Sequence, residues 1–137
     1  MKTPKTETIK FQGVEREYGV WPSDCFGDAD VPRWWIMYNK ETGDVSISDE
    51  VRQDYRPHMV FHELYEAESD ASGKRPCVEA LVAELARVSD GELERYVPFR
   101  KNVFEELVDW AHRNEKDIEA GARESLGYLG RIKNGND

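Results

Sequence analysis

The 137-residue sequence has little cysteine, no long apolar run and no recognisable export signal. Its two cysteines, Cys25 and Cys77, stand far apart and form no CxxC motif, which excludes a zinc site of four cysteines and favours a reducing compartment. The longest apolar run, residues 34–38, is far shorter than the roughly 20 residues of a membrane-spanning helix. The first residues contain no apolar signal-peptide core. Together these absences predict a cytoplasmic protein.

Several enzyme motifs are also missing. The sequence contains no GxSxG, no P-loop and no GxGxxG, which excludes a serine-hydrolase elbow, a P-loop NTPase and a dinucleotide-binding fold. A di-iron carboxylate bundle needs two Glu-x-x-His motifs, and none occurs.

Positive charge is in deficit, because the formal net charge is −9. A chain of this sign repels nucleic acid and anionic membranes, so we expect neither as a partner. The charge is compatible with a basic protein partner. The sequence gives no indication of the oligomeric state.

The order of local patterns predicts an α+β fold. The length suits a single domain, residues 1–137, with its own core. Alternating apolar residues predict two β-hairpins in residues 1–50. These strands cover residues 6–21, 33–39 and 45–48. Helical periodicity and capping signals predict four to five helices in residues 54–133. They cover residues 54–69, 76–88, a segment from Ser89 that Pro98 interrupts, 98–114 and 116–133. We expect a small antiparallel sheet packed on this helical half.

The most informative stretch is the predicted helix around His58, His62, Glu63 and Glu66. At about 100° per residue, His62 and Glu66 fall roughly 40° and 80° from His58, and Glu63 falls roughly 140° from it. The opposite side of the wheel carries the apolar residues Val60, Phe61, Leu64 and Ala67. The pattern predicts an apolar face on the core and a polar face that opens to water or a cleft.

This polar face has the spacing of a metal site. His62 and Glu66, at positions i and i+4, can reach one cation, and imidazole nitrogen and carboxylate oxygen both suit zinc. Glu63 lies beside the first ligand, where a carboxylate can take a proton from metal-bound water. The alternative interpretation is a solvated helix face, since 34% of the residues are charged.

The hairpin followed by His62-Glu63-Leu64-Tyr65-Glu66-Ala67 resembles the zincin metallopeptidases. It is similar to the short HExxE variants of phage-type, toxin-associated and uncharacterised bacterial proteins, and the resemblance covers residues 33–88. It implies a Zn²⁺ cofactor, His62 and Glu66 as ligands, Glu63 as general base, and hydrolysis of a peptide or protein substrate. The family's common motif has His where Glu66 stands. A carboxylate ligand adds negative charge and lowers the Lewis acidity of the metal.

The third metal ligand has several candidates. By analogy with zincins that take a Glu from the next helix, Glu79 comes first. Glu84 and Asp70 are alternatives, and His58 is a further one from within the same helix. His112 is expected to be a surface residue of a charged helix.

A second functional hypothesis comes from the charge. It is a non-enzymatic acidic interaction protein, a phage- or plasmid-type regulator or inhibitor, that binds a basic protein partner. A zincin fold that has lost its activity could serve this role.

Overall fold

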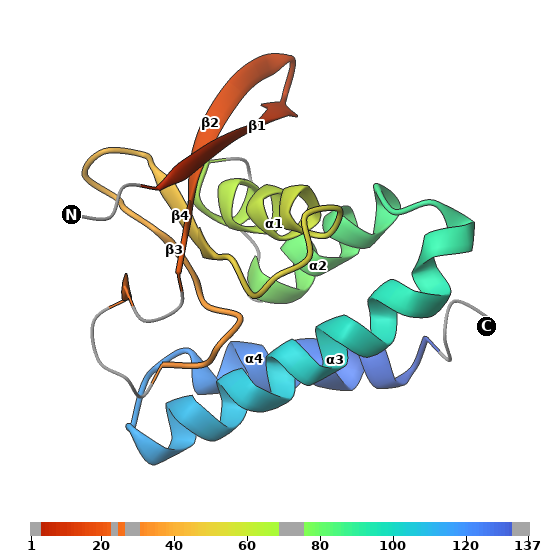
Figure 1. Cartoon of the computed structure of the whole chain (residues 1–137). Coiled ribbons are helices and arrows are strands. Elements are labelled where there is room, and N and C mark those ends of the chain that lie inside the picture. Colours follow the sequence, from red (N-terminus) through yellow and green to blue (C-terminus); the bar gives the residue numbers. More distant parts are fainter. Residues whose placement is uncertain (1–3, 23–24, 27–30, 69–75, 133–137) are drawn as a thin grey trace. The chain divides into compact units, whose positions relative to one another are not determined.

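The structure is a computed structural model of the chain. It describes residues 4–22, 25–26, 31–68 and 76–132. The contacts divide the chain into two compact units, residues 1–70 and residues 71–137. Within the described residues, the first unit contains four strands and one helix, and the second contains three helices (Figure 1). The predicted α+β class is therefore confirmed, while the single domain stays a prediction.

The sheet of the first unit is built from two hairpins. Its strands are β1 (Lys5–Phe11), β2 (Val14–Trp21), β3 (Ile36–Tyr38) and β4 (Val45–Ser48). The turns that join each pair contain Gly13 and Gly43 at φ 80° and 78°, a backbone conformation that glycine adopts without strain. Both predicted hairpins are antiparallel, as expected.

Two sequence-based expectations about the sheet are wrong in detail. The strand order is β1-β2-β4-β3, and β2 pairs with β4 in parallel, so the sheet is mixed rather than antiparallel. Local patterns define each hairpin but not how two hairpins join. Of the predicted strand 33–39, only Ile36–Tyr38 forms a strand, although the carbonyl of Trp35 still accepts a hydrogen bond from the amide of Ser48 at 2.8 Å.

The helix of the first unit, α1 (Arg56–Glu68), contacts β1, β3 and β4. The ring of Phe61 meets the ring of Phe11 edge-on, with the centroids 5.5 Å apart. The strands bury alternate apolar residues, as expected for a sheet with one covered face. These buried residues are Ile9, Phe11, Tyr18, Val20, Val45 and Ile47.

The second unit consists of α2 (Pro76–Ala86), α3 (Asp90–Arg113) and α4 (Glu119–Gly130), and α4 contacts both other helices. The predicted break at Pro98 is wrong, because α3 continues through it. Proline removes one hydrogen bond, to the carbonyl of Glu94. Both Pro98 and Glu94 are exposed, so water can reach that carbonyl. In the part of the chain that the structure describes, no helix is long and apolar enough to cross a membrane.

Candidate metal site

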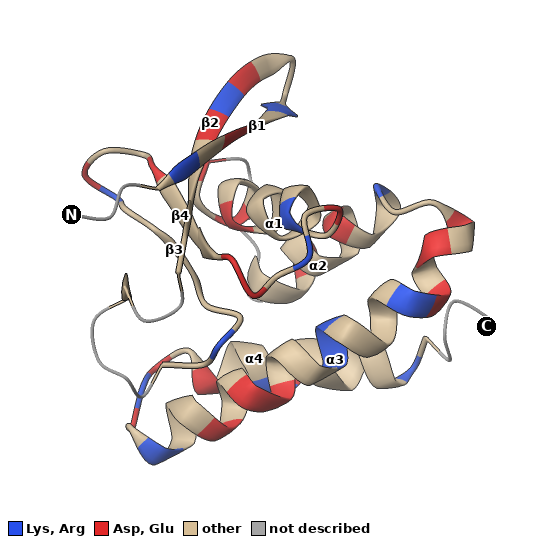
Figure 2. Ribbon diagram, in the orientation of Figure 1, with Lys and Arg blue, Asp and Glu red and all other residues tan. Residues whose placement is uncertain are grey.

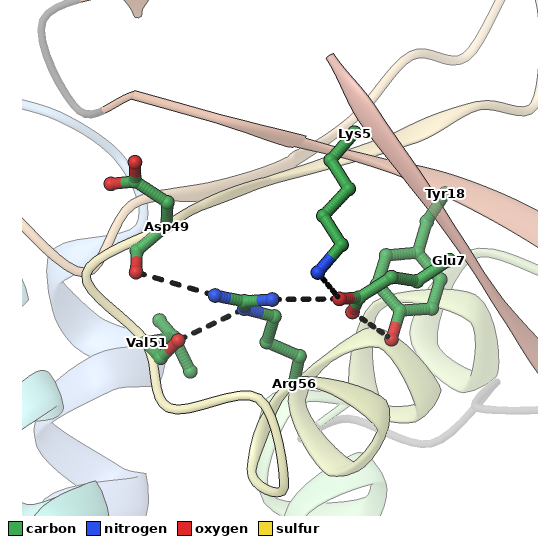
Figure 3. Close-up of polar contacts among 6 residues, drawn as sticks. All are labelled: Lys5, Glu7, Tyr18, Asp49, Val51 and Arg56. Atoms are coloured by element: carbon green, nitrogen blue, oxygen red, sulfur yellow. Dashed lines mark hydrogen bonds and ion pairs between the residues drawn. The ribbon is translucent and has the colours of Figure 1, made fainter.

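The first residue of α1 is tied to the sheet and to the preceding loop. Arg56 donates from Nη1 to the Glu7 carboxylate at 2.8 Å, and from Nε to the Val51 carbonyl at 2.9 Å (Figure 3). A longer bond, 3.4 Å, reaches the carbonyl of Asp49. The Tyr18 hydroxyl also donates to Glu7, at 3.0 Å. One guanidinium thereby fixes the start of the helix against β1 and the loop.

The last residue of α1 is tied to the same sheet. Arg16 on β2 donates two hydrogen bonds to the Glu68 carboxylate, at 2.6 and 2.9 Å. The Tyr38 hydroxyl on β3 donates a third, at 2.6 Å, and Arg16 also reaches the carbonyl of Gly43 at 3.1 Å. The bonds from Arg16 and then from Tyr38 lower the pKa of Glu68 to about 2. The helix is therefore anchored at both ends.

Between these anchors, the two predicted ligands on successive turns come together. His62 Nε2 lies 3.2 Å from Glu66 Oε2. Two ligands of one tetrahedral zinc ion, each about 2.0–2.2 Å from it, lie about 3.4 Å apart. The same distance also suits a hydrogen bond between imidazole and carboxylate. The pair therefore has the donor atoms and the spacing of two ligands of one zinc ion.

The predicted open polar face is wrong for His62. Its side chain is 3% exposed, whereas that of Glu66 is 38% exposed. On the apolar side, Val60 and Leu64 are buried as predicted, but Ala67 is exposed. A helical wheel gives directions around the axis, but it does not say how far covering surfaces extend along the helix. The pair thus has one buried member and one member that reaches solvent.

Two other predicted site residues lie on the same helix. Glu63 is half-buried and follows His62 directly, as the general-base hypothesis requires. His58 is half-buried one turn earlier. Within the described residues of the first unit, no third His, Cys, Asp or Glu side chain, that of His58 included, lies close enough to both His62 and Glu66 to share one metal ion with them in this conformation. His58 as a ligand stays a prediction.

The remaining candidates fall into different environments. Glu79 is half-buried in α2 of the second unit, and its assignment as third ligand stays a prediction. Glu84 is fully buried, and both of its oxygens accept bonds from Arg100. Asp70 lies outside the described residues. His112 is exposed, as expected.

Sequence reasoning missed both anchors of α1. Arg56 and its partner Glu7 are 49 residues apart, and Arg16 and Glu68 are 52 residues apart. None of these residues stands in a motif, so no local signal could have paired them. A charged residue at each end of the predicted helix was the only available hint.

Comparisons with known proteins assign the chain to no family. No family model, curated protein or solved structure matches the chain. The likeness to zincins therefore rests on the HExxE motif and the order of the elements around it.

Proposed function

We propose that the protein is a zinc-dependent peptidase of the zincin type, with His62 and Glu66 as two of its metal ligands. The observation that carries this proposal is the 3.2 Å separation of His62 Nε2 and Glu66 Oε2 on one helix. The anchors at Arg56 and Glu68 add to it, because ligands held on a rigid element need little rearrangement to bind.

The residues around the pair have separate roles in the proposed reaction. Zinc, when bound, supplies a Lewis acid that polarises the scissile carbonyl and makes water more acidic. The Glu63 carboxylate accepts the proton of the attacking water and delivers it to the leaving amine nitrogen. Burial holds the His62 ring in one orientation. The partial exposure of Glu66 leaves its side of the pair accessible.

The third ligand is proposed to be Glu79, with His58 as the alternative. Each can be tested by substitution, Glu79→Gln and His58→Ala, and the correct one lowers zinc affinity as His62→Ala does. A variant that keeps the zinc affinity of wild type excludes its residue as the third ligand.

The experiment that tests the function measures zinc content and proteolysis on the same tag-free, full-length protein. We expect bound zinc and cleavage of an unfolded casein substrate. Glu63→Gln should keep the zinc and lose cleavage, and His62→Ala should lose both. His112→Ala is the matched control, because His112 also lies 3.2 Å from a glutamate, Glu119, but on an exposed surface. Cleavage that survives in Glu63→Gln contradicts the mechanism.

Absence of zinc from the wild-type protein would favour the acidic interaction protein instead. The net charge of −9 favours a basic partner for that role. In the described residues, Asp and Glu occur on helices of both units together with Lys and Arg (Figure 2). A partner held by this charge should dissociate as salt is raised, because salt screens exposed charges.

A further inference from the structure

The last turn of α1 is electrostatically unfavourable by itself. It contains Glu66 and Glu68 and no basic residue. Carboxylates at this position face the negative end of the helix dipole, and the last four carbonyls of a helix lack partners within it. Such a turn opens more readily than the rest of its helix. Glu66, the candidate ligand, would then lose its position beside His62.

The sheet supplies the positive charge that the helix lacks. Both oxygens of Glu68 accept hydrogen bonds from Arg16, and one also accepts the hydroxyl of Tyr38. Arg16 and Tyr38 project from β2 and β3, and Arg16 is further fixed by its bond to the Gly43 carbonyl. We call these three residues, Glu68, Arg16 and Tyr38, the exposed triad.

The exposed triad and the ligand pair use different sides of the same turn. Glu66 and Glu68 are two residues apart, which is about 200° around a helix. Glu68 can therefore bind the sheet while Glu66 reaches His62, and each interaction requires the same helical backbone. Holding Glu68 therefore also restricts the backbone from which Glu66 projects.

We propose that Arg16 and Tyr38 are positioning residues for Glu66: by holding Glu68 they keep the last turn of α1 helical and fix the carboxylate of Glu66 against His62. The inference rests on the proposed metal site. It assigns a role in metal binding to residues that act through Glu68.

The test compares zinc dissociation constants, measured by competition with a chromophoric chelator on the full chain. We expect Arg16→Gln and Glu68→Gln to weaken zinc binding about tenfold, the lower end of the effect of outer-shell partners on metal affinity. Tyr38→Phe, which keeps the ring, should weaken it less. The swap Arg16→Glu with Glu68→Arg should restore much of the affinity. Affinities of Arg16→Gln and Glu68→Gln equal to that of wild type would overturn the inference.

Arg52→Gln is the matched control. Arg52 also donates two hydrogen bonds to a carboxylate of the first unit, that of Asp54, and it lies before α1 rather than at its end. Its loss should leave zinc affinity unchanged. If Arg52→Gln weakens zinc as much as Arg16→Gln, the effect is general and the positioning role is wrong.

Amide hydrogen exchange of the metal-free protein separates this inference from the proposed function. We expect exchange at residues 65–68 to accelerate several-fold in Glu68→Gln, with little change at residues 59–62. If wild type binds no zinc, the proposed function fails, and the exchange result still decides whether Arg16 and Tyr38 order the turn. Unchanged exchange at residues 65–68 overturns the inference in either case.

Discussion

Two groups of the same composition, one in each unit, differ in burial. The exposed triad joins α1 to β2 and β3, and the second group, which we call the buried triad, joins α2 to α3 and consists of Glu84, Arg100 and Tyr96. In each, an arginine donates two hydrogen bonds to a glutamate and a tyrosine hydroxyl donates another. The arginine and glutamate side chains are each 27% exposed in the first and at most 4% exposed in the second.

The difference teaches that burial, rather than bond pattern, decides what such a group does. Burial by itself lowers the pKa of Arg100, but the charges of Glu84 and Tyr96 and the hydrogen bonds to Glu84 together outweigh it, and the pKa is raised overall. Removing either charge leaves the other stranded away from water. In the exposed triad, water can solvate whichever partner remains, so its contribution to global stability is small. We expect a buried group of this kind to hold a unit together and an exposed one to act locally.

The largest expected effect comes from breaking the buried triad. Arg100→Met should lower the free energy of unfolding of the second unit by about 3–5 kcal/mol, because Glu84 remains buried and charged. Urea denaturation followed at the amides of α2 and α3 measures it. The double variant Glu84→Leu with Arg100→Met should recover most of the loss. A loss below about 1 kcal/mol in the single variant, the range of exposed pairs, would remove the distinction between the triads.

The tyrosines provide a matched pair of smaller changes. Tyr96→Phe should cost about 1.5–3 kcal/mol, the usual range for a hydrogen bond to a charged group, because the Glu84 oxygen keeps one fewer donor in a buried site. Tyr38→Phe should cost less, since water can replace its hydroxyl at Glu68. Thermal unfolding of both variants and of wild type measures these two losses of stability. Equal losses of stability in the two variants would mean that exposure does not change what the tyrosine hydroxyl contributes.

A smaller effect still is expected from Glu68→Gln on global stability. We predict a loss of at most about 1 kcal/mol in the first unit, which shrinks further in high salt as the Arg16 charge is screened. Urea denaturation at low and high salt measures both parts. A loss as large as that of Arg100→Met would make the exposed triad a general stabiliser and not a local one.

The last prediction concerns alkaline pH and the anchor at Arg56. Burial, followed by the hydrogen bond to Glu7, raises the pKa of Tyr18 above its usual value of 10.0. A raised folded-state pKa gives stability that is complete below pH 10 and is lost as pH rises above it, because only the unfolded chain releases the proton. Stability measured between pH 9 and 11 should fall less steeply in Tyr18→Phe than in wild type. Equal slopes of stability against pH in the two proteins would contradict the raised pKa of Tyr18.

Whether a feature could be predicted from the sequence depends on how far apart in the chain its interacting residues lie. The hairpin turn at Gly13 and the strand Val45–Ser48 depend on neighbouring residues, and both are found where local patterns placed them. The pairing of β2 with β4, the continuation of α3 through Pro98 and the bond between Arg16 and Glu68 depend on distant residues or on solvent access. These were missed or predicted wrongly.

The candidate site divides in the same way. The i,i+4 spacing of His62 and Glu66 predicts that their side chains can meet, and the structure brings them to 3.2 Å. The burial of His62 is not contained in that spacing. Nor are the anchors at the two ends of α1, because each joins residues about 50 positions apart in the chain.

The central claim is that α1 binds zinc through His62 and Glu66, and a calorimetric titration of Zn²⁺ into metal-free, tag-free protein tests it most directly. We predict one zinc ion per chain for wild type and for His112→Ala, and no saturable binding for His62→Ala. Wild type that binds no zinc, or His62→Ala that binds it as tightly as wild type, would contradict the claim.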